Sequence, residues 1–309
     1  MRAVIVRRPG GPEVLEVADL PEPRPGPGQV RIRVAAAAVN RIDLSTRSGA
    51  LAAAGLLPPG PVGLGWDVAG MIDEVGPGVR RRAPGDAVIG LRDVLSAGGA
   101  QAEWVVLDEL AIAPAPRSTT PPEAATLPLI GLTADRALAL TGLQAGQALL
   151  VTGAAGGVGG LLLQLAALRG IRTVAVAGEA DEKTVRERGA DEFVARTDRL
   201  GAAVRTVQPG GVDAVIDAAV AGVTAHEALR SGGTFVALVA PFAPPPLRAT
   251  RVVVAEVWAD GGRLTELAAL VDAGLLTLRV ADARPLAEVA GAHERLAAGG
   301  LRGRLVLLP

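Results

Sequence analysis

At 148–160 the chain reads Ala148-Leu149-Leu150-Val151-Thr152-Gly153-Ala154-Ala155-Gly156-Gly157-Val158-Gly159-Gly160, an apolar strand pattern that passes through a glycine-dense turn into a helical pattern. Gly153 permits the tight turn, Gly156 lets the backbone approach a pyrophosphate, and Gly159 allows the helix to pack against the strand. A second strand pattern at 173–177 completes the context that this motif requires, so the stretch predicts dinucleotide binding at the N-terminus of the helix. An ordinary glycine-rich turn is the alternative, because 40 glycines among 309 residues produce close spacings by chance. The turn residues expected to contact the cofactor are Gly153, Ala155, Gly156, Gly157 and Val158.

Length and charge narrow the class of protein. A chain of 309 residues suggests two domains. Its 32 acidic and 31 basic residues nearly cancel, which argues against a nucleic-acid or membrane partner. No run of about 20 apolar residues occurs, and Met1–Arg8 has the pattern of a strand rather than of a signal peptide. We therefore expect a soluble, cytoplasmic protein.

The first third of the chain alternates short apolar strands with turns rich in proline and glycine, such as Pro58-Pro59-Gly60-Pro61. This alternation is typical of a compact, barrel-like β domain. The strand patterns fall at 1–7, 29–39, 70–75, 86–90 and 102–107.

From Pro121 onward, helical and strand patterns alternate, which favours a doubly wound sheet of six parallel strands. The remaining segments, from Leu264, are expected to return to the first domain. We thus predict an α/β protein with one domain at 1–119 and 259–309 and a second at 120–258. The expected helices lie at 122–127, 133–141, 264–273 and 286–298, and the expected strands near 148–152, 172–177, 192–195, 213–217, 234–239, 252–257, 276–280 and 304–308.

The chain contains no cysteine and no tyrosine. The absence of cysteine removes disulfides, thiolate ligands and cysteine nucleophiles, and a zinc site usually needs more donors than the two histidines supply. We therefore expect no metal. His226 and His293 are interpreted as packing or capping residues.

Several motifs follow one another along the chain: Asn40-Arg41-Ile42-Asp43, Gly65-Trp66-Asp67-Val68-Ala69-Gly70, Pro84-Gly85-Asp86-Ala87-Val88, Gly131-Leu132-Thr133-Ala134, Glu187-Arg188-Gly189-Ala190-Asp191 and Gly303-Arg304-Leu305-Val306-Leu307. Taken in this order, they resemble the medium-chain dehydrogenase/reductase family in its zinc-independent quinone oxidoreductase (zeta-crystallin-like) branch. In zinc-containing relatives, a ligand cysteine occupies the position of Asn40 and a ligand histidine that of Trp66. The resemblance implies a GroES-like β-rich catalytic domain joined to a Rossmann cofactor domain.

The resemblance implies hydride transfer from nicotinamide to a quinone or an α,β-unsaturated carbonyl. The negative charge that develops on the substrate oxygen then requires preorganised donors. Asn40 is the candidate, either as such a donor or as a group that holds the nicotinamide ribose, and its structural alternative is a strand cap. Asp43 and Arg47 are expected to form an ion pair.

No general acid is assigned. Many relatives carry a tyrosine shortly after the aspartate of the first motif, where this chain has Leu44-Ser45-Thr46. Ser45 or Thr46 as a relay and protonation by solvent are both open. Thr133 resembles a family residue near the nicotinamide, with a helix N-cap as the other interpretation.

The choice of cofactor depends on the end of the second strand, where an acidic residue would bind the ribose hydroxyls of NAD. This strand ends in Gly178, with Glu179 one residue further on, so NAD is not excluded. Lys183, the single lysine of the chain, falls where the NADPH-using relatives keep a lysine, and Arg196 where relatives often carry a tyrosine near the phosphate. The resemblance therefore implies that these basic residues meet a 2′-phosphate. A solvated helix face is the alternative for Lys183. We favour NADPH over NADH.

Further site residues follow from the expected fold. Val239 and Ala240 close the fifth strand at the edge where doubly wound sheets bind ligands, and the family motif adds Arg304 to the cofactor set. An apolar pocket for a small hydrophobic quinone or enone is expected from Leu51, Leu57, Trp66 and Phe242. The apolar sixth strand at 252–257 favours a homodimer.

Three hypotheses about function remain. The first is an NADPH-dependent quinone or enone reductase, the second a pathway-specific enoyl reductase of secondary metabolism on the same scaffold, and the third a weakly catalytic NADPH-binding protein.

Overall fold

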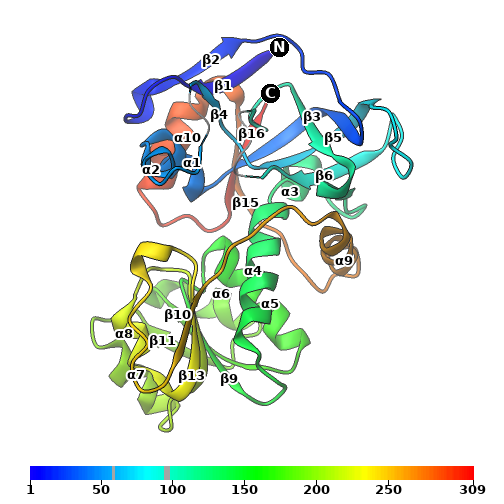
Figure 1. The fold of residues 1–309 in the computed structure, drawn as a ribbon. Helices are drawn as coiled ribbons and strands as arrows, with labels where there is room; N and C mark the ends of the chain where they lie inside the picture. Colours follow the sequence, from blue (N-terminus) through cyan, green and yellow to red (C-terminus); the bar gives the residue numbers. More distant parts are fainter. Residues whose placement is uncertain (58–59, 94–97) are drawn as a thin grey trace. The chain divides into compact units, whose positions relative to one another are not determined.

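The computed structural model describes residues 1–57, 60–93 and 98–309, and this part of the chain forms two compact units (Figure 1). Unit 1 comprises Met1–Leu132 and Trp258–Pro309, and unit 2 comprises Thr133–Val257. The first boundary therefore lies later than the 119/120 boundary of the sequence interpretation. Residues 120–132 group with unit 1 because helix α3 (Pro121–Ala124) packs against strands β3 (Gln29–Val39) and β5 (Asp67–Val75). The predicted turn at Pro58-Pro59 lies outside the described residues.

Unit 1 is built on β-sheets. Within the described residues, a seven-stranded sheet runs in the order β15-β16-β3-β5-β6-β8, with β7 paired to β3, and a smaller sheet has the order β2-β1-β4. One of its buried apolar clusters contains Val30 and Ile32 of β3 together with Val68 and Ile72 of β5. The remaining strands are β1 (Arg2–Val6), β2 (Leu15–Asp19), β4 (Val62–Gly63), β6 (Ala87–Leu91), β7 (Trp104–Asp108), β8 (Ile112–Pro114), β15 (Val280–Pro285) and β16 (Arg304–Leu308). The helices are η1 (Pro12–Val14), α1 (Arg41–Arg47), α2 (Ala50–Ala53), η2 (Glu109–Ala111), α9 (Gly261–Asp272), η5 (Leu286–Glu288) and α10 (Val289–Ala297).

The strand predicted at 276–280 is wrong, because β15 begins only at Val280. The amides of Leu275 and Leu276 both donate to the carbonyl of Leu270, so this apolar run closes the C-terminal end of α9. Leu276 is buried there. Strand β15 lies at the edge of the sheet and carries the charged residues Asp282 and Arg284. Because of these charges, its sequence is not the apolar run that predicts a strand.

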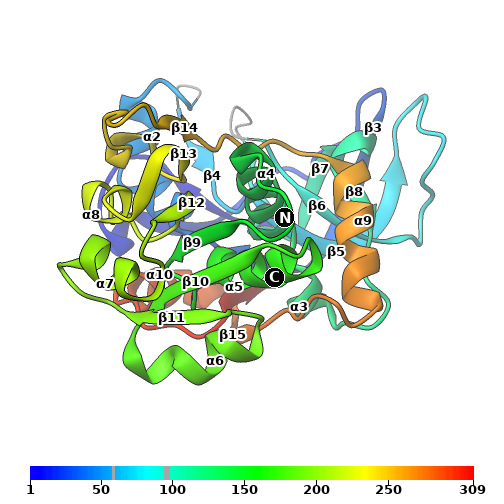
Figure 2. The ribbon, with the colours of Figure 1, turned by 90° about the horizontal axis from the view of Figure 1, so that it is seen from below.

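Unit 2 contains the predicted doubly wound sheet. Within the described residues its six strands are all parallel, in the order β11-β10-β9-β12-β13-β14, and Figure 2 shows them in this succession. Figure 1 shows α7 and α8 on one side of the sheet and α5 on the other. The strands are β9 (Ala148–Thr152), β10 (Arg172–Ala177), β11 (Glu192–Ala195), β12 (Val212–Asp217), β13 (Leu229–Ala237) and β14 (Arg251–Val254). The helices are α4 (Pro128–Thr141, which begins in unit 1), α5 (Gly157–Leu168), η3 (Glu179–Asp181), α6 (Glu182–Glu187), α7 (Leu200–Val207), α8 (Val223–His226) and η4 (Ala240–Phe242).

The central strands of this sheet are buried on both faces, as the continuous apolar run of β9 requires. The order of connection reverses between β9 and β12, and doubly wound folds bind ligands at the carboxyl ends of strands beside such a reversal. The edge strand β14 ends at Val254 rather than at 257 as predicted, although Ala255 still donates to the carbonyl of Ala237. Among the described residues no helix is long and apolar enough to cross a membrane.

Candidate active site

The glycine turn between β9 and α5 forms as predicted from the sequence. Gly153 adopts a φ of 62°, in the left-handed region that favours glycine. Gly156 is the N-cap of α5, which begins at Gly157. A Cβ on Gly159 would collide with the carbonyl oxygen of Gly153 and lie 2.7 Å from the Cα of Ala154. The helix can therefore approach the strand only without a side chain here, and the N–H groups of its first turn have no acceptor within the helix.

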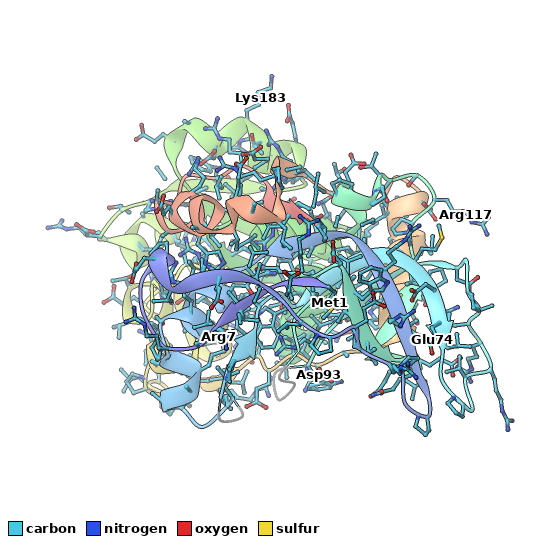
Figure 3. The ribbon with its side chains drawn as sticks, turned by 90° about the horizontal axis from the view of Figure 1, so that it is seen from above. Met1, Arg7, Glu74, Asp93, Arg117 and Lys183 are labelled. Carbon is cyan, nitrogen blue, oxygen red and sulfur yellow. The ribbon has the colours of Figure 1, made fainter. Side chains whose placement is uncertain are left out.

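The end of the second strand brings two predicted cofactor residues together. The N–H of Arg196 donates to the carbonyl of Ala177 (2.9 Å), so Arg196, directly after β11, lies beside Gly178, directly after β10. Arg196 is exposed. Lys183 projects outward from α6, with 89% of its side chain exposed and its Nζ 3.9 Å from Glu187 (Figure 3). Of these two cations, Arg196 is the one that lies directly beside the end of β10.

The loop after β13 and helix α4 carry the remaining candidates of unit 2. Val239 is the N-cap of η4, Ala240 its first residue, and Phe242 is 53% exposed. Thr133 lies inside α4, which begins at Pro128, so its interpretation as an N-cap is wrong. The sequence analysis missed Asp217, a buried carboxylate at the end of β12 that gathers the N–H groups of the following loop. The sequence signal that could have indicated Asp217 is an acidic residue at the end of an apolar strand.

In unit 1, Asn40 lies at the start of α1 and is 2% exposed. It caps this helix rather than a strand. Its Nδ2 donates to Oδ2 of Asp67 (2.7 Å), and its Oδ1 accepts from Nη2 of Arg304. Arg304 also donates to the carbonyl of Val39 (2.8 Å). Both ends of the Asn40 amide are thus held by charged partners, which leaves little capacity to donate to a substrate oxygen.

Two buried carboxylates lie in this cluster. Burial raises the pKa of Asp67 to about 6, although Asn40 and the N–H of Leu129 (2.6 Å) both donate to it. Burial raises the pKa of Asp43 to about 7 against hydrogen bonds from the N–H groups of Asn40 (2.7 Å) and Gly65 (3.0 Å). The sequence analysis quoted Asp67 within a motif but gave it no role.

The predicted ion pair between Asp43 and Arg47 is wrong. The carboxylate of Asp43 turns back to the start of α1, where its oxygens accept from backbone N–H groups, whereas Nη1 of Arg47 lies 3.4 Å from Nδ1 of His293. Burial, and then the charge of Arg47, lower the pKa of His293 to about 4. His226 contacts Thr250 Oγ1 through Nε2 (2.8 Å), and both histidines lie in packed interiors.

Of the predicted pocket residues in unit 1, Leu51 and Leu57 are half-buried and Trp66 is 1% exposed. The guanidinium carbon of Arg92 lies 4.4 Å from the centroid of the Trp66 ring, a cation–π contact. Burial lowers the pKa of Arg92 to about 10. Arg92 was another residue that sequence reasoning missed, because no local pattern indicates which ring it covers.

Comparison with known proteins agrees with this architecture. Residues 26–117 match the family model of the alcohol dehydrogenase GroES-like domain, and residues 188–307 match that of zinc-binding dehydrogenases. An NADPH-dependent alkenal/one oxidoreductase of Arabidopsis thaliana chloroplasts is 31% identical over 100% of this chain and 80% of its own length. A spectinabilin polyketide synthase protein of Streptomyces orinoci is 37% identical over 56% of this chain, and the match spans only 8% of that much longer relative.

Solved structures give the same result. The quinone oxidoreductase of Coxiella burnetii superposes with a TM-score of 0.89 at 28% identity, covering 100% of this chain and 99% of its own. Mycobacterial Rv1454c in complex with NADPH superposes with a TM-score of 0.88 at 30% identity, covering both chains fully. The chain therefore belongs to the medium-chain dehydrogenase/reductase family, in the branch of the quinone oxidoreductases, and is an oxidoreductase that uses a nicotinamide cofactor.

The family model's description implies zinc, but the residues of this chain do not fit it. The sequence has no cysteine, and its two histidines lie in different units. Across residues 1–57, 60–93 and 98–309, no three His, Asp or Glu side chains converge in a way that would hold a metal ion.

Proposed function

We propose that the chain is an NADPH-dependent, metal-free reductase of quinones or α,β-unsaturated carbonyls. The observation that carries the proposal is the combination in unit 2 of a glycine cradle at the start of α5 with an exposed arginine, Arg196, beside Gly178. The NADPH dependence of the plant relative and the NADPH complex of the mycobacterial neighbour support the same cofactor.

Each part of the cofactor has a proposed partner in unit 2. The first turn of α5 receives the pyrophosphate, and the guanidinium of Arg196 receives the 2′-phosphate. Gly178 stands where NAD-specific proteins use an acidic residue, so nothing at this position repels that phosphate. Bound reduced nicotinamide supplies a hydride for the electrophilic carbon of the substrate.

The charge on the substrate oxygen must be met by other groups. With its amide held between Asp67 and Arg304, Asn40 is better suited to accept one hydrogen bond from a ribose hydroxyl than to donate to an oxyanion. We therefore propose that solvent protonates the product, since quinone reduction requires no precisely placed acid. Leu51, Leu57 and Phe242 stay proposed apolar contacts of the substrate, and Trp66 leaves this set because it is 1% exposed and covered by Arg92.

The test is the rate of nicotinamide oxidation by the purified protein, with NADPH and NADH in parallel, against a panel of quinones and α,β-unsaturated ketones. Turnover of several members with a preference for NADPH supports the proposal. Saturable NADPH binding without turnover of any member contradicts it.

A second candidate is an enoyl reductase dedicated to one biosynthetic pathway. The resemblance to a polyketide synthase protein over more than half of this chain favours it. A pathway enzyme reduces an enoyl thioester, such as a crotonyl thioester of N-acetylcysteamine, much faster than simple quinones. Equal or slower reduction of the thioester argues against this candidate.

We also propose a homodimer that pairs through β14. This strand lies at the edge of the six-stranded sheet, with Val252 and Val253 half-buried and Val254 37% exposed. Light scattering tests this proposal, because the molar mass of a single chain at working concentration would exclude a dimer. If the dimer forms through β14, Val253→Lys should convert it to monomers.

A further inference from the structure

Val220, in the loop after β12, has an unusual backbone conformation. Its φ is 53°, in the left-handed region, where a β-branched residue is a steric outlier. Among the described residues other than glycine, the same region is occupied only at Arg248 and Ala249, in the loop before β14. Strained residues of this kind persist only where their surroundings hold them, and they concentrate at functional sites.

The surroundings of Val220 do hold it. The buried carboxylate of Asp217 accepts from the N–H of Ala221 (3.0 Å) and of Gly222 (2.8 Å) on one side of Val220. On the other side, the N–H of Ala219 donates to Oγ1 of Thr152 (3.1 Å), which itself donates to Asp217 (2.5 Å). The loop is thus fixed at both flanks to the ends of β9 and β12.

The position of this loop relates Val220 to the proposed ligand site. It follows β12, the strand next to β9 at the reversal of connection, and lies beside the glycine turn: a Cβ on Gly153 would be 3.2 Å from the carbonyl oxygen of Ala218. On its other flank, a Cβ on Gly222 would be 3.4 Å from the carbonyl oxygen of Phe242, in η4. The loop therefore lies between the phosphate cradle and the end of β13.

Val220 is apolar, yet the residue is 44% exposed, and Val239 and Phe242 of the neighbouring loop are exposed as well. Glycine at position 220 would adopt the left-handed conformation without strain. Burial in the protein interior therefore does not explain why a strained valine stands here.

We propose that the side chain of Val220 packs against the nicotinamide and its ribose when the cofactor is bound, and that it helps to set the affinity and orientation of that half of the cofactor. This inference rests on the proposed function. In the order of strands β10, β9, β12 and β13, the adenosine end of the cofactor lies over β10 and the pyrophosphate over β9, so the nicotinamide half lies over β12. Val220 presents an apolar face there.

The experiment compares V220G and V220A with A249G as a matched control for strain. Affinities for NADPH and for 2′,5′-ADP, which carries only the adenosine half, are measured by calorimetry, together with Tm. Relief of strain should raise the Tm of V220G and of A249G by about 2 to 4 °C. V220G should weaken NADPH binding by about tenfold and leave 2′,5′-ADP binding within twofold, whereas A249G should change neither affinity. V220A, which keeps the strained backbone with a smaller side chain, should weaken NADPH binding by about threefold without a rise in Tm.

The outcomes separate this inference from the function on which it rests. An unchanged NADPH affinity in V220G and V220A, in a protein that turns over normally, overturns the inference and leaves the proposed function intact. Equal weakening of NADPH and 2′,5′-ADP also overturns it, because the side chain would then support the phosphate cradle. A wild-type protein that binds neither ligand ends both proposals.

Discussion

The glycine turn of unit 2 and the Asn40 cluster of unit 1 are constructed in opposite ways. The turn presents backbone N–H groups of consecutive residues, and its requirement is the absence of side chains at Gly153 and Gly159. The cluster joins side chains from distant parts of the chain, namely the buried Asn40 and Asp67 and the half-buried Arg304. We therefore expect the glycine turn to be sensitive to added side-chain volume, and the Asn40 cluster to be sensitive to the loss of a charge.

The largest effect is expected from removal of charge in the cluster. Asp67→Ala removes the carboxylate that accepts from Nδ2 of Asn40 and from the N–H of Leu129 and that faces Arg304, so we expect a loss of about 3 to 5 kcal/mol in the free energy of unfolding. Urea denaturation measures it. Glu16→Ala in the same unit is the control, because its ion pair with Arg7 is exposed at both side chains and should contribute less than about 1 kcal/mol. Equal losses in the two variants would show that the cluster is no more sensitive to charge than the surface.

A methyl group tests the glycine turn. Gly159→Ala forces α5 away from β9, and overpacking of this kind costs about 2 to 3 kcal/mol of stability. NADPH affinity should fall at least about tenfold, since the first turn of α5 moves with the helix. Gly210→Ala is the control, because its Cβ would meet no atom within 4 Å. Calorimetric titration with unchanged affinity in Gly159→Ala would remove the turn from the cofactor site.

A buried histidine of unit 1 gives a pH test. The pKa of His293 falls from an ordinary value near 6.5 to about 4 on folding, so its neutral form belongs to the folded state. Its contribution to stability is intact above pH 6.5 and is lost as the pH falls toward 4, by about 2 kcal/mol at pH 5.

The difference in unfolding free energy between wild type and His293→Gln, measured from pH 7 to pH 5, isolates this group. Burial raises the pKa of both Asp43 and Asp67, whose effects on stability have the opposite sign and are present in both proteins. A difference that does not vary with pH would show that His293 titrates normally in the folded state.

The smallest effect concerns cofactor choice. Arg196→Ala should reduce the preference for NADPH over NADH in kcat/KM by about tenfold, which corresponds to about 1.4 kcal/mol from one charge-assisted contact. Arg172→Ala is the control, because it removes the same charge from the amino end of β10, away from the carboxyl end where Arg196 lies. It should leave the preference for NADPH over NADH unchanged. If both variants behave alike, Arg196 does not bind the 2′-phosphate.

What could be predicted from the sequence follows the same division between the two regions. The strand, turn and helix at 148–168 and the six-stranded parallel sheet were predictable because their signals are local, namely glycine spacing and apolar runs. The ion pair expected between Asp43 and Arg47 failed because spacing along a helix does not reveal that Asp43 bonds to the helix start. The strand expected at 276–280 failed because apolar content alone does not distinguish a strand from the end of a helix.

By itself the sequence determined the class of fold, the place of the cofactor turn and the family, since each depends on the order of residue types along the chain. Only the tertiary structure decided that Asp67 and Arg304 hold the two ends of the Asn40 amide, that Arg92 covers Trp66, and that Asp217 holds Val220 in a left-handed conformation. The physical reason is that hydrogen bonds and burial act between atoms that are close in space, and the long-range packing of strands brings those atoms together.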